Sequence, residues 1–210
     1  MPVLRNKLSR YTDLPSLISI LRTQSLTLLS PSSWDDKNDS YYMSLYKKRR
    51  RLSCLAALCF SRATETYHHW RVFAGHSSGV CVQFHTDALL ESLIKHEGLL
   101  AKPVSYRTLP ALRKHPPRIG QLPFVKRAGF KDEKEFRLVF QSSADLDGPV
   151  SFEIPLKTID RIVLSPWLNK ALRDHLTHVL KSIPGCNGIS IVRSTLVAND
   201  EWRAIGDGAA

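Results

Sequence analysis

The order of strand-like and helix-like segments is the feature that most limits the fold of this chain. Apolar runs typical of buried strands occupy Leu52–Phe60 and Gly79–Phe84, and later strand-like segments follow without helices alternating regularly between them. A doubly wound parallel sheet requires that alternation, so we exclude it. We predict an α+β fold with one or two mixed sheets flanked by helices, with a single domain over residues 1–203 and a flexible tail over 204–210.

Periodicity and capping residues place the individual elements. The helix beginning after Asp13 is the clearest, because Asp13 is a good N-cap and four apolar residues follow at helical spacing. Residues 34–39 have loop chemistry. The predicted helices are 14–22, 41–51, 67–73, 87–96 and 165–180, and the predicted strands are 4–11, 26–30, 52–60, 79–84, 99–106, 133–140, 150–154, 159–164 and 188–192.

The charge of the chain points to an anionic partner. Thirty basic and 19 acidic residues give a net charge of +11. The bases gather in Lys47–Arg51 and in Lys102–Arg137, where ten bases face three acids. If both regions share one face, a phosphate backbone is a suitable partner, whereas a solvated helix end and a basic loop are the alternative. The candidate nucleic-acid-binding residues are Lys47, Lys48, Arg49, Arg50, Arg51, Lys126 and Arg127, and the aromatic residues that would stack bases or pack in the core are Tyr41, Tyr42, Tyr46, Tyr106 and Phe124.

Cysteine and hydropathy patterns exclude several other classes. No two of the four cysteines have zinc-site spacing, and Cys54, Cys59 and Cys81 lie in apolar runs typical of buried thiols. We therefore expect neither a metal site nor a disulfide. No stretch of about 18 apolar residues is present, and the first residues lack the apolar region of a secretory signal. These patterns indicate a cytoplasmic protein that does not cross a membrane.

The segment Phe130–Phe140 carries the pattern most suggestive of a site. As a strand it would separate an aromatic and aliphatic face from a charged face. Two carboxylates steadied by an arginine on that face would suit the orientation of a ribose hydroxyl or a nucleophile, and a solvent face with a surface ion pair is the alternative. The apolar face would hold Phe136, Leu138 and Phe140, and the charged face Glu133, Glu135 and Arg137.

The order of motifs along most of the chain resembles a large bacterial domain family related to abortive-infection proteins. More distantly, that family resembles ADP-ribosyltransferases of the DarT and toxin type, which split NAD in the cleft of a split β-sandwich. The motifs that carry the resemblance are Arg10-Tyr11, the helix 14–22, Leu28-Leu29-Ser30-Pro31, Trp34-Asp35-Asp36, Cys59-Phe60-Ser61, the block from Trp70 to Phe84, Val104-Ser105-Tyr106 and the block from Lys131 to Arg137.

The resemblance implies a role for particular residues toward NAD. Arg10 would hold the pyrophosphate, and Ser61 would lie beside the nicotinamide ribose. Glu135 would bind the 2′-hydroxyl of that ribose and stabilise the positive charge as nicotinamide leaves, while Glu133 would orient or deprotonate the acceptor. The residues implied to contact the cofactor also include Tyr11, with Trp34, Trp70 or Phe73 stacking on nicotinamide.

These expectations define a first hypothesis and two alternatives. The first is a toxin or phage-defence effector that uses NAD to ADP-ribosylate an anionic macromolecule, most simply nucleic acid, and that has an antitoxin or immunity protein as a possible partner. The second is a non-catalytic nucleic-acid- or protein-binding module on the same fold, in which Glu133 and Glu135 form surface pairs with Lys131 and Arg137. The third is a metal-independent nuclease that uses His68 or His69.

Overall fold

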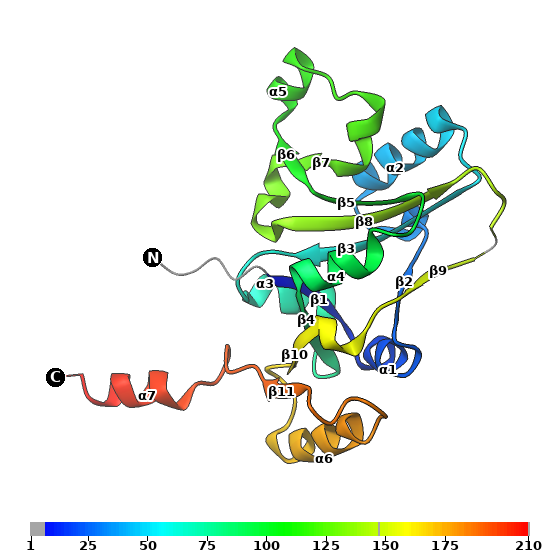
Figure 1. Ribbon diagram of the computed structural model, residues 1–210. Coiled ribbons are helices and arrows are strands. Elements are labelled where there is room, and N and C mark those ends of the chain that lie inside the picture. Colours follow the sequence, from blue (N-terminus) through cyan, green and yellow to red (C-terminus); the bar gives the residue numbers. More distant parts are fainter. Residues whose placement is uncertain (1–6, 147, 210) are drawn as a thin grey trace.

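The computed structural model describes residues 7–146 and 148–209 (Figure 1). Its centre is a seven-stranded mixed sheet in the order β11-β10-β4-β1-β3-β8-β5, in which β10 and β11 are parallel and the other pairs are antiparallel. The prediction of an α+β fold with a mixed sheet flanked by helices is confirmed. The strands of this sheet are β1 (Lys7–Asp13), β3 (Cys54–Ser61), β4 (Gly79–His85), β5 (Leu99–Pro103), β8 (Glu135–Ser142), β10 (Ile159–Leu164) and β11 (Ser190–Arg193).

The large sheet is nearly divided between β1 and β3. These two strands pair at one position, Ser9 with Ser61, whereas β1 pairs with β4 over seven residues and β3 pairs with β8 over eight. We call this boundary the seam. One half of the sheet is β11-β10-β4-β1, and the other half is β3-β8-β5.

Shorter elements surround the large sheet. Two-stranded sheets are formed by β2 (Ser25–Leu28) with β9 (Val150–Glu153), and by β6 (Ser105–Arg107) with β7 (Val125–Arg127). The helices are α1 (Leu14–Thr23), α2 (Lys37–Arg50), α3 (Tyr67–His69), α4 (Thr86–Leu93), α5 (Leu109–Lys114), α6 (Lys170–Lys181) and α7 (Asp200–Asp207), with the shorter turns η1 (Pro31–Ser33), the π-helical η2 (Trp70–Ala74), η3 (Ile119–Phe124), η4 (Ala128–Glu133) and η5 (Leu156–Thr158). No helix among the described residues is both long enough and apolar enough to cross a bilayer.

Two apolar layers cover the half-sheet that contains β3 and β8. Alternate residues of β3 point to opposite sides, so Leu58 and Phe60 join the main core with α1, α4 and β9, while Leu55 and Ala57 pack against α2 and η3. In β8, Leu138 likewise enters the main core and the charged residues face α2. Helix α2 therefore covers the face that carries the predicted polar pattern (Figure 1).

Helix α2 begins within the region predicted as loop. The Asp36 side chain accepts hydrogen bonds from the backbone N–H groups of Asn38 and Asp39 and so caps the helix at Lys37. The consequence is that Asp39, Met43 and Tyr46 share one buried face of the helix. By contrast, α1 begins at Leu14 as predicted, with Asp13 accepting from the N–H of Ser16.

Other boundaries also differ from the predictions. The strand expected from Glu133 begins at Glu135, because Lys134 adopts a left-handed conformation with φ of 44° and Glu133 ends η4. The strand expected over 99–106 is interrupted at Val104, and the helix expected from Ser165 begins at Lys170 after the N-cap Asn169.

Residues 4–6 of the predicted first strand lie outside the described residues. Part of the segment predicted as a tail is helical, since α7 spans Asp200–Asp207 after the N-cap Asn199 accepts from the N–H of Trp202. Helix α7 extends away from the sheet (Figure 1) and leaves Trp202 79% exposed.

Candidate functional site

A pocket of about 590 Å³ opens where the sheet is divided. Its size falls within the range of small-molecule sites, about 300–1,000 Å³. It receives residues from both halves of the sheet and from the helices above them. The lining comes from β1 (Ser9–Asp13), β3 (Cys59–Ser61), His69, η2 and its end (Val72–Gly75), the loop 33–36, Asp39, Lys126, Phe130, Glu133 and Glu135.

Strand register brings three of the predicted residues to this pocket. Ser61 lies opposite Ser9 of β1 on one side and opposite Glu135 of β8 on the other. Adjacent strands lie about 4.8 Å apart, so Ser9 and Glu135 are separated by about 10 Å across β3. Arg10 follows Ser9 and also lines the pocket. Arg10, Ser61 and Glu135, which are far apart in the sequence, therefore border one cavity.

Arg10 spans the seam. Its Nη1 donates a hydrogen bond to the backbone carbonyl of Cys59, 3.1 Å away, where β1 and β3 have no ladder of their own. A guanidinium has five N–H donors, and among the described residues the Cys59 carbonyl is the one acceptor bound to that of Arg10. Arginine stays protonated at neutral pH. Arg10 therefore brings a positive charge and further donors to the β1 side of the pocket.

A buried cluster of five charged side chains forms the opposite side. Arg137 is fully buried and donates to Glu135 (Nε–Oε1, 2.5 Å), to Asp39 (Nη1–Oδ1, 2.8 Å) and to the backbone carbonyl of Pro123. Lys126 Nζ lies 2.7 Å from Glu133 Oε2 and 3.3 Å from Glu135 Oε2. Three carboxylates and two cations give the cluster a net charge of −1 when every group is ionised.

The two glutamates of the cluster have opposite pKa shifts. Burial alone would raise the pKa of Glu135, but the neighbouring Arg137 and Lys126 outweigh it and lower the pKa to about 2. For Glu133, burial prevails over the attraction of Lys126 and raises the pKa. Glu135 is thus a permanent carboxylate at neutral pH, while Glu133 holds a proton more readily than an ordinary glutamate.

These positions correct one reading of the charged pattern. Glu135 and Arg137 lie on the opposite face of β8 from Phe136, as predicted, yet that face is buried under α2 and is not a solvent face. Glu133 pairs with Lys126, and its expected surface pair with Lys131 is not formed. The surface-pair alternative is therefore wrong for these residues.

Ser61 and His69 form a buried hydrogen-bonded chain. Ser61 Oγ donates to the backbone carbonyl of Glu133 (2.6 Å), so it accepts from His69 Nε2 (3.1 Å), and Thr66 Oγ1 lies 2.5 Å from His69 Nδ1 and donates to it. Burial lowers the pKa of His69, which keeps the ring neutral at physiological pH. His69 donates to Ser61 and cannot take its proton. The chain fixes the position of Ser61 without activating it.

Some of the predicted aromatic residues line the pocket, and others are buried in the core. Tyr11 lines the pocket and stacks on His69 with ring centroids 5.1 Å apart, and Phe73 lines it with 42% of its surface exposed. Trp34 lines it too and lies against the guanidinium of Arg137. Trp70, in contrast, is fully buried and donates from Nε1 to Glu65. Trp70 does not line the pocket and packs with Tyr11, Ala74 and Cys81, so the structure does not bring it to the position predicted for a cofactor contact.

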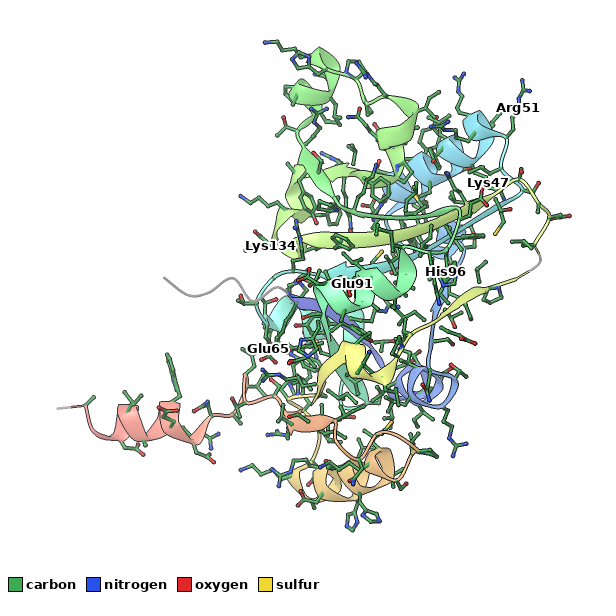
Figure 2. The ribbon with its side chains drawn as sticks, viewed as in Figure 1. Lys47, Arg51, Glu65, Glu91, His96 and Lys134 are labelled. Carbon is green, nitrogen blue, oxygen red and sulfur yellow. The ribbon has the colours of Figure 1, made fainter. Side chains whose placement is uncertain are left out.

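The predicted basic residues also divide. Lys47, Lys48, Arg49, Arg50 and Arg51 are exposed at the end of α2, where Figure 2 shows Lys47 and Arg51, and Arg127 is exposed on β7. Lys126 is an exception, since its side chain is 10% exposed and is held by carboxylates. Lys126 belongs to the pocket and does not lie with the exposed bases.

The two basic regions meet in space. Segment η3 packs on α2 through Leu122, Phe124, Met43 and Tyr46, and the guanidinium of Arg50 approaches Gly120. Tyr46 and Phe124 are buried in this contact and are excluded as base-stacking residues. The contact brings η3, whose N-cap is the exposed Arg118, to the end of α2.

Sequence reasoning missed Asp39 and the part that Lys126 plays in the pocket. The signal for Asp39 was present, because its spacing to Met43 and Tyr46 is that of one helical face. Nothing in the sequence indicated Lys126, whose position depends on how β7 folds back over β8. The described residues contain no group of three His, Cys, Asp or Glu side chains suited to a metal ion.

The chain is similar to solved structures of DarT from Thermus sp. 2.9. The complex of that protein with ADP-ribosylated ssDNA is 11% identical and has a TM-score of 0.48, with 90% of this chain and 94% of that chain covered. Its complex with NAD+ is 10% identical (TM-score 0.48; 90% and 96% covered), and its complex with carba-NAD+ is 12% identical (TM-score 0.46; 90% and 96% covered). No protein-family model and no curated protein matches the chain.

Proposed function

We propose that this chain is an ADP-ribosyltransferase that transfers the ADP-ribosyl group of NAD to an anionic macromolecule, with nucleic acid as the acceptor. One observation carries the proposal. The pocket at the seam has the cation Arg10 on one side and the carboxylates of Glu133 and Glu135 on the other. A dinucleotide with an anionic pyrophosphate and a cationic nicotinamide riboside has the complementary arrangement of charge.

The proposed reaction places a negative group where positive charge develops. The bond between C1′ of the ribose and the nicotinamide nitrogen breaks, and its electron pair leaves with the nicotinamide. Glu135, ionised at neutral pH, binds the ribose 2′-hydroxyl and stabilises the resulting oxocarbenium character. Because Arg137 holds both oxygens of Glu135 (Nε–Oε1 2.5 Å, Nη2–Oε2 3.0 Å), the carboxylate needs no reorganisation during the reaction.

Glu133 has the properties of the base in this scheme. The nucleophilic atom of the acceptor forms the new bond to C1′, and its proton passes to Glu133. The raised pKa of Glu133 improves its match to a proton acceptor that works near neutral pH. On the other side of the pocket, Arg10 binds the pyrophosphate, and Tyr11 and Phe73 provide aromatic surface for the nicotinamide.

The surface supports an acceptor that carries phosphate. Exposed bases lie at the end of α2 and at the beginning of η3, which packs on that helix, and positive charge at these places suits binding driven by counterion release. Action within the cytoplasm as a toxin or defence effector, with an antitoxin or immunity protein as its partner, belongs to the same proposal.

The test is incubation with NAD labelled in its adenosine part, together with mixed cellular RNA, DNA and protein. The wild type is expected to release nicotinamide and to label the nucleic acid fraction. Glu135→Gln keeps the size of the side chain and is expected to reduce nicotinamide release about 100- to 1000-fold. Glu91→Gln is the matched control, since Glu91 is exposed on α4 away from the pocket (Figure 2).

The controls separate catalysis from folding. Thermal unfolding of Glu135→Gln is measured alongside, because Glu135 also neutralises Arg137. Equal labelling by the wild type and a folded Glu135→Gln variant contradicts the proposal. Binding of nucleic acid with no turnover of NAD favours the non-catalytic module.

A further inference from the structure

The last helix of the described chain projects from the body without covering it. Helix α7 extends away from the sheet (Figure 1), and all eight of its residues are exposed. Trp202 is 79% exposed and Ile205 is 69% exposed, and their spacing of three places them on one face of the helix. We call residues 195–209, which include this helix, the arm. Two large apolar side chains of the arm therefore face solvent together.

The start of the arm is held by the body of the protein. Ser194 is buried, and its backbone N–H donates to the carbonyl of Leu164 while its Oγ donates to Glu65 Oε1. The preceding residue, Arg193, donates from Nε to the carbonyl of Leu168, 2.8 Å away. The arm therefore leaves the body at a fixed point, and its exposed helix begins at Asp200.

A helix as short as α7 needs a surface on which to pack. Isolated helices shorter than about 12–15 residues are marginal in water, because few hydrogen bonds offset the cost of forming the first turn. The N-cap Asn199 adds one bond, from the N–H of Trp202 (2.8 Å). The ion pair between Asp200 and Lys170 (3.7 Å) is exposed and so adds little. Burial of the apolar face is the larger stabilising contribution still open to α7.

A suitable surface adjoins the start of the arm. The rings of Tyr67 and Trp167 meet edge to face with centroids 5.6 Å apart, and the guanidinium of Arg71 lies 5.8 Å and 5.5 Å from the same two centroids. Tyr67 is 54% exposed, and Arg71 is also exposed. We call these three residues the aromatic patch. Glu65, which binds Ser194, precedes Tyr67 by two residues, so the patch lies close to the fixed point of the arm (Figure 2).

The chemistry of the aromatic patch complements that of the arm. Trp, Tyr and Arg are enriched among the side chains that contribute most to protein interfaces. The guanidinium of Arg71 contacts two rings and His76, and it forms no ion pair with a carboxylate among the described residues. Helix α7 has a net charge of −2, from Asp200, Glu201, Arg203 and Asp207, in a chain whose net charge is +11. The arm thus offers both apolar surface and carboxylates to the patch.

We propose that the aromatic patch binds the arm of a second copy of this chain, in a two-fold symmetric dimer that exchanges arms. Each arm starts beside its own patch and points away from the body, so a two-fold axis near that point carries each arm onto the patch of the partner. The proposal is independent of the transferase activity. Val72 and Phe73, which follow Arg71, line the pocket at the seam, so the partner's arm would lie beside that pocket.

The charge of α7 disfavours other occupants of this surface. A net negative helix repels nucleic acid. A helix that lies on a membrane surface carries Lys and Arg on its polar face, whereas the face of α7 opposite Trp202 and Ile205 carries Asp200 and Asp207. Binding of α7 to its own patch would give a monomer, so the oligomeric state decides between these arrangements.

The test is the molar mass of the full chain, measured by sedimentation velocity over a series of protein concentrations. The wild type is expected to pass from the mass of one chain to that of two as the concentration rises. Loss of a central interface side chain raises a dissociation constant by about 30-fold or more, and the dimer contains this contact twice, so Trp202→Ala should raise it about 1000-fold. Tyr41→Ala is the matched control, because Tyr41 is similarly exposed (62%) but lies on α2.

Mixing two charge-reversed variants tests the aromatic patch itself. Arg71→Glu opposes a negative patch to a negative arm, and the double variant Glu201→Lys, Asp207→Lys opposes a positive arm to a positive patch, so each alone should dimerise less than the wild type. In a mixed dimer both contacts join opposite charges. An equimolar mixture should therefore recover the dimer, which misfolding of either variant could not produce.

The outcomes separate this inference from the proposed function. A wild type with the mass of one chain up to its limit of solubility overturns the proposal, and so does a dimer that Trp202→Ala leaves intact. A dimer that is weakened by Trp202→Ala but is not recovered in the mixture refutes the aromatic patch as the binding site. None of these measurements uses NAD, so they stand or fall separately from the transferase proposal.

Discussion

Replacing Arg137 tests the role of the buried charge cluster most directly. This side chain is fully buried and makes five hydrogen bonds, two to Asp39, two to Glu135 and one to the carbonyl of Pro123. Arg137→Met fills a similar volume but leaves both carboxylates without this partner. Breaking a buried ion pair in this way costs about 3–5 kcal/mol.

The expected loss of stability is large enough for a simple assay. For a protein of this size, each kcal/mol shifts the melting temperature by about 2–4 °C, so Arg137→Met should melt about 6–20 °C below the wild type at pH 7.5, measured by circular dichroism. We expect a decrease in the lower half of that range, because Lys126 Nζ remains 3.3 Å from Glu135 Oε2 and still partly neutralises it. Arg22→Met, at an exposed site, should change the free energy of unfolding by about 0.5 kcal/mol or less.

Acidification provides the internal check. Without Arg137, the pKa of Glu135 rises from its wild-type value, because the largest attraction that lowers it is lost while burial remains. The penalty therefore disappears as the carboxylate gains a proton. The difference in melting temperature between variant and wild type should therefore narrow between pH 7.5 and pH 5. If Arg137→Met melts within about 2 °C of the wild type at pH 7.5, the charge cluster does not stabilise the fold.

Three further predictions concern Glu135, Glu133 and Tyr106. The depressed pKa of Glu135, about 2, means that its stabilising contribution is complete above its unfolded value near 4.5 and is lost as the pH falls toward 2; acid unfolding of Glu135→Gln should lack this component. If Glu133 is the base, transfer should decline as the pH falls through its raised pKa, above 4.5, and a pH–rate profile of Glu133→Gln should show a rate about 100- to 10,000-fold lower with that limb absent. Tyr106 accepts from the backbone N–H of Glu135 at 2.7 Å, so Tyr106→Phe should cost about 1–3 kcal/mol in urea unfolding, and a value near zero would show that another group satisfies that N–H.

The elements of this fold that can be predicted from the sequence are those whose residue pattern follows the period of a helix or a strand. Helix α1 follows from the cap Asp13 and the spacing of its leucines, and β3 follows from an apolar run buried on both faces. The two faces of β8 follow from its alternation. In each case the residue types depend on the period of the element, so neighbouring residues suffice to identify it.

The remaining features depend on contacts between distant segments. A single sequence cannot reveal that α2 covers the charged face of β8, and this is the reason why Arg137 is buried and not at the surface. Lys134 has a left-handed conformation that separates Glu133 from the strand, and the residue types around it do not indicate this conformation. Lys126 enters the cluster only because β6 and β7 return over β8, so its role could not be separated from that of its neighbour Arg127.

The narrow seam between β1 and β3 has a consequence for motion. With Ser9 and Ser61 as the single paired position, the two half-sheets are joined there by little backbone hydrogen bonding, and the side chain of Arg10 provides a further bond across the gap. Amide hydrogen exchange reports such differences as cooperative units of unequal protection. The N–H of Ala57 bonds to the carbonyl of Leu29 and is protected. We expect the other amides of β1 and β3 that face the gap to exchange with deuterium faster than those paired with β4 and β8, and a ligand that bridges the gap to slow their exchange.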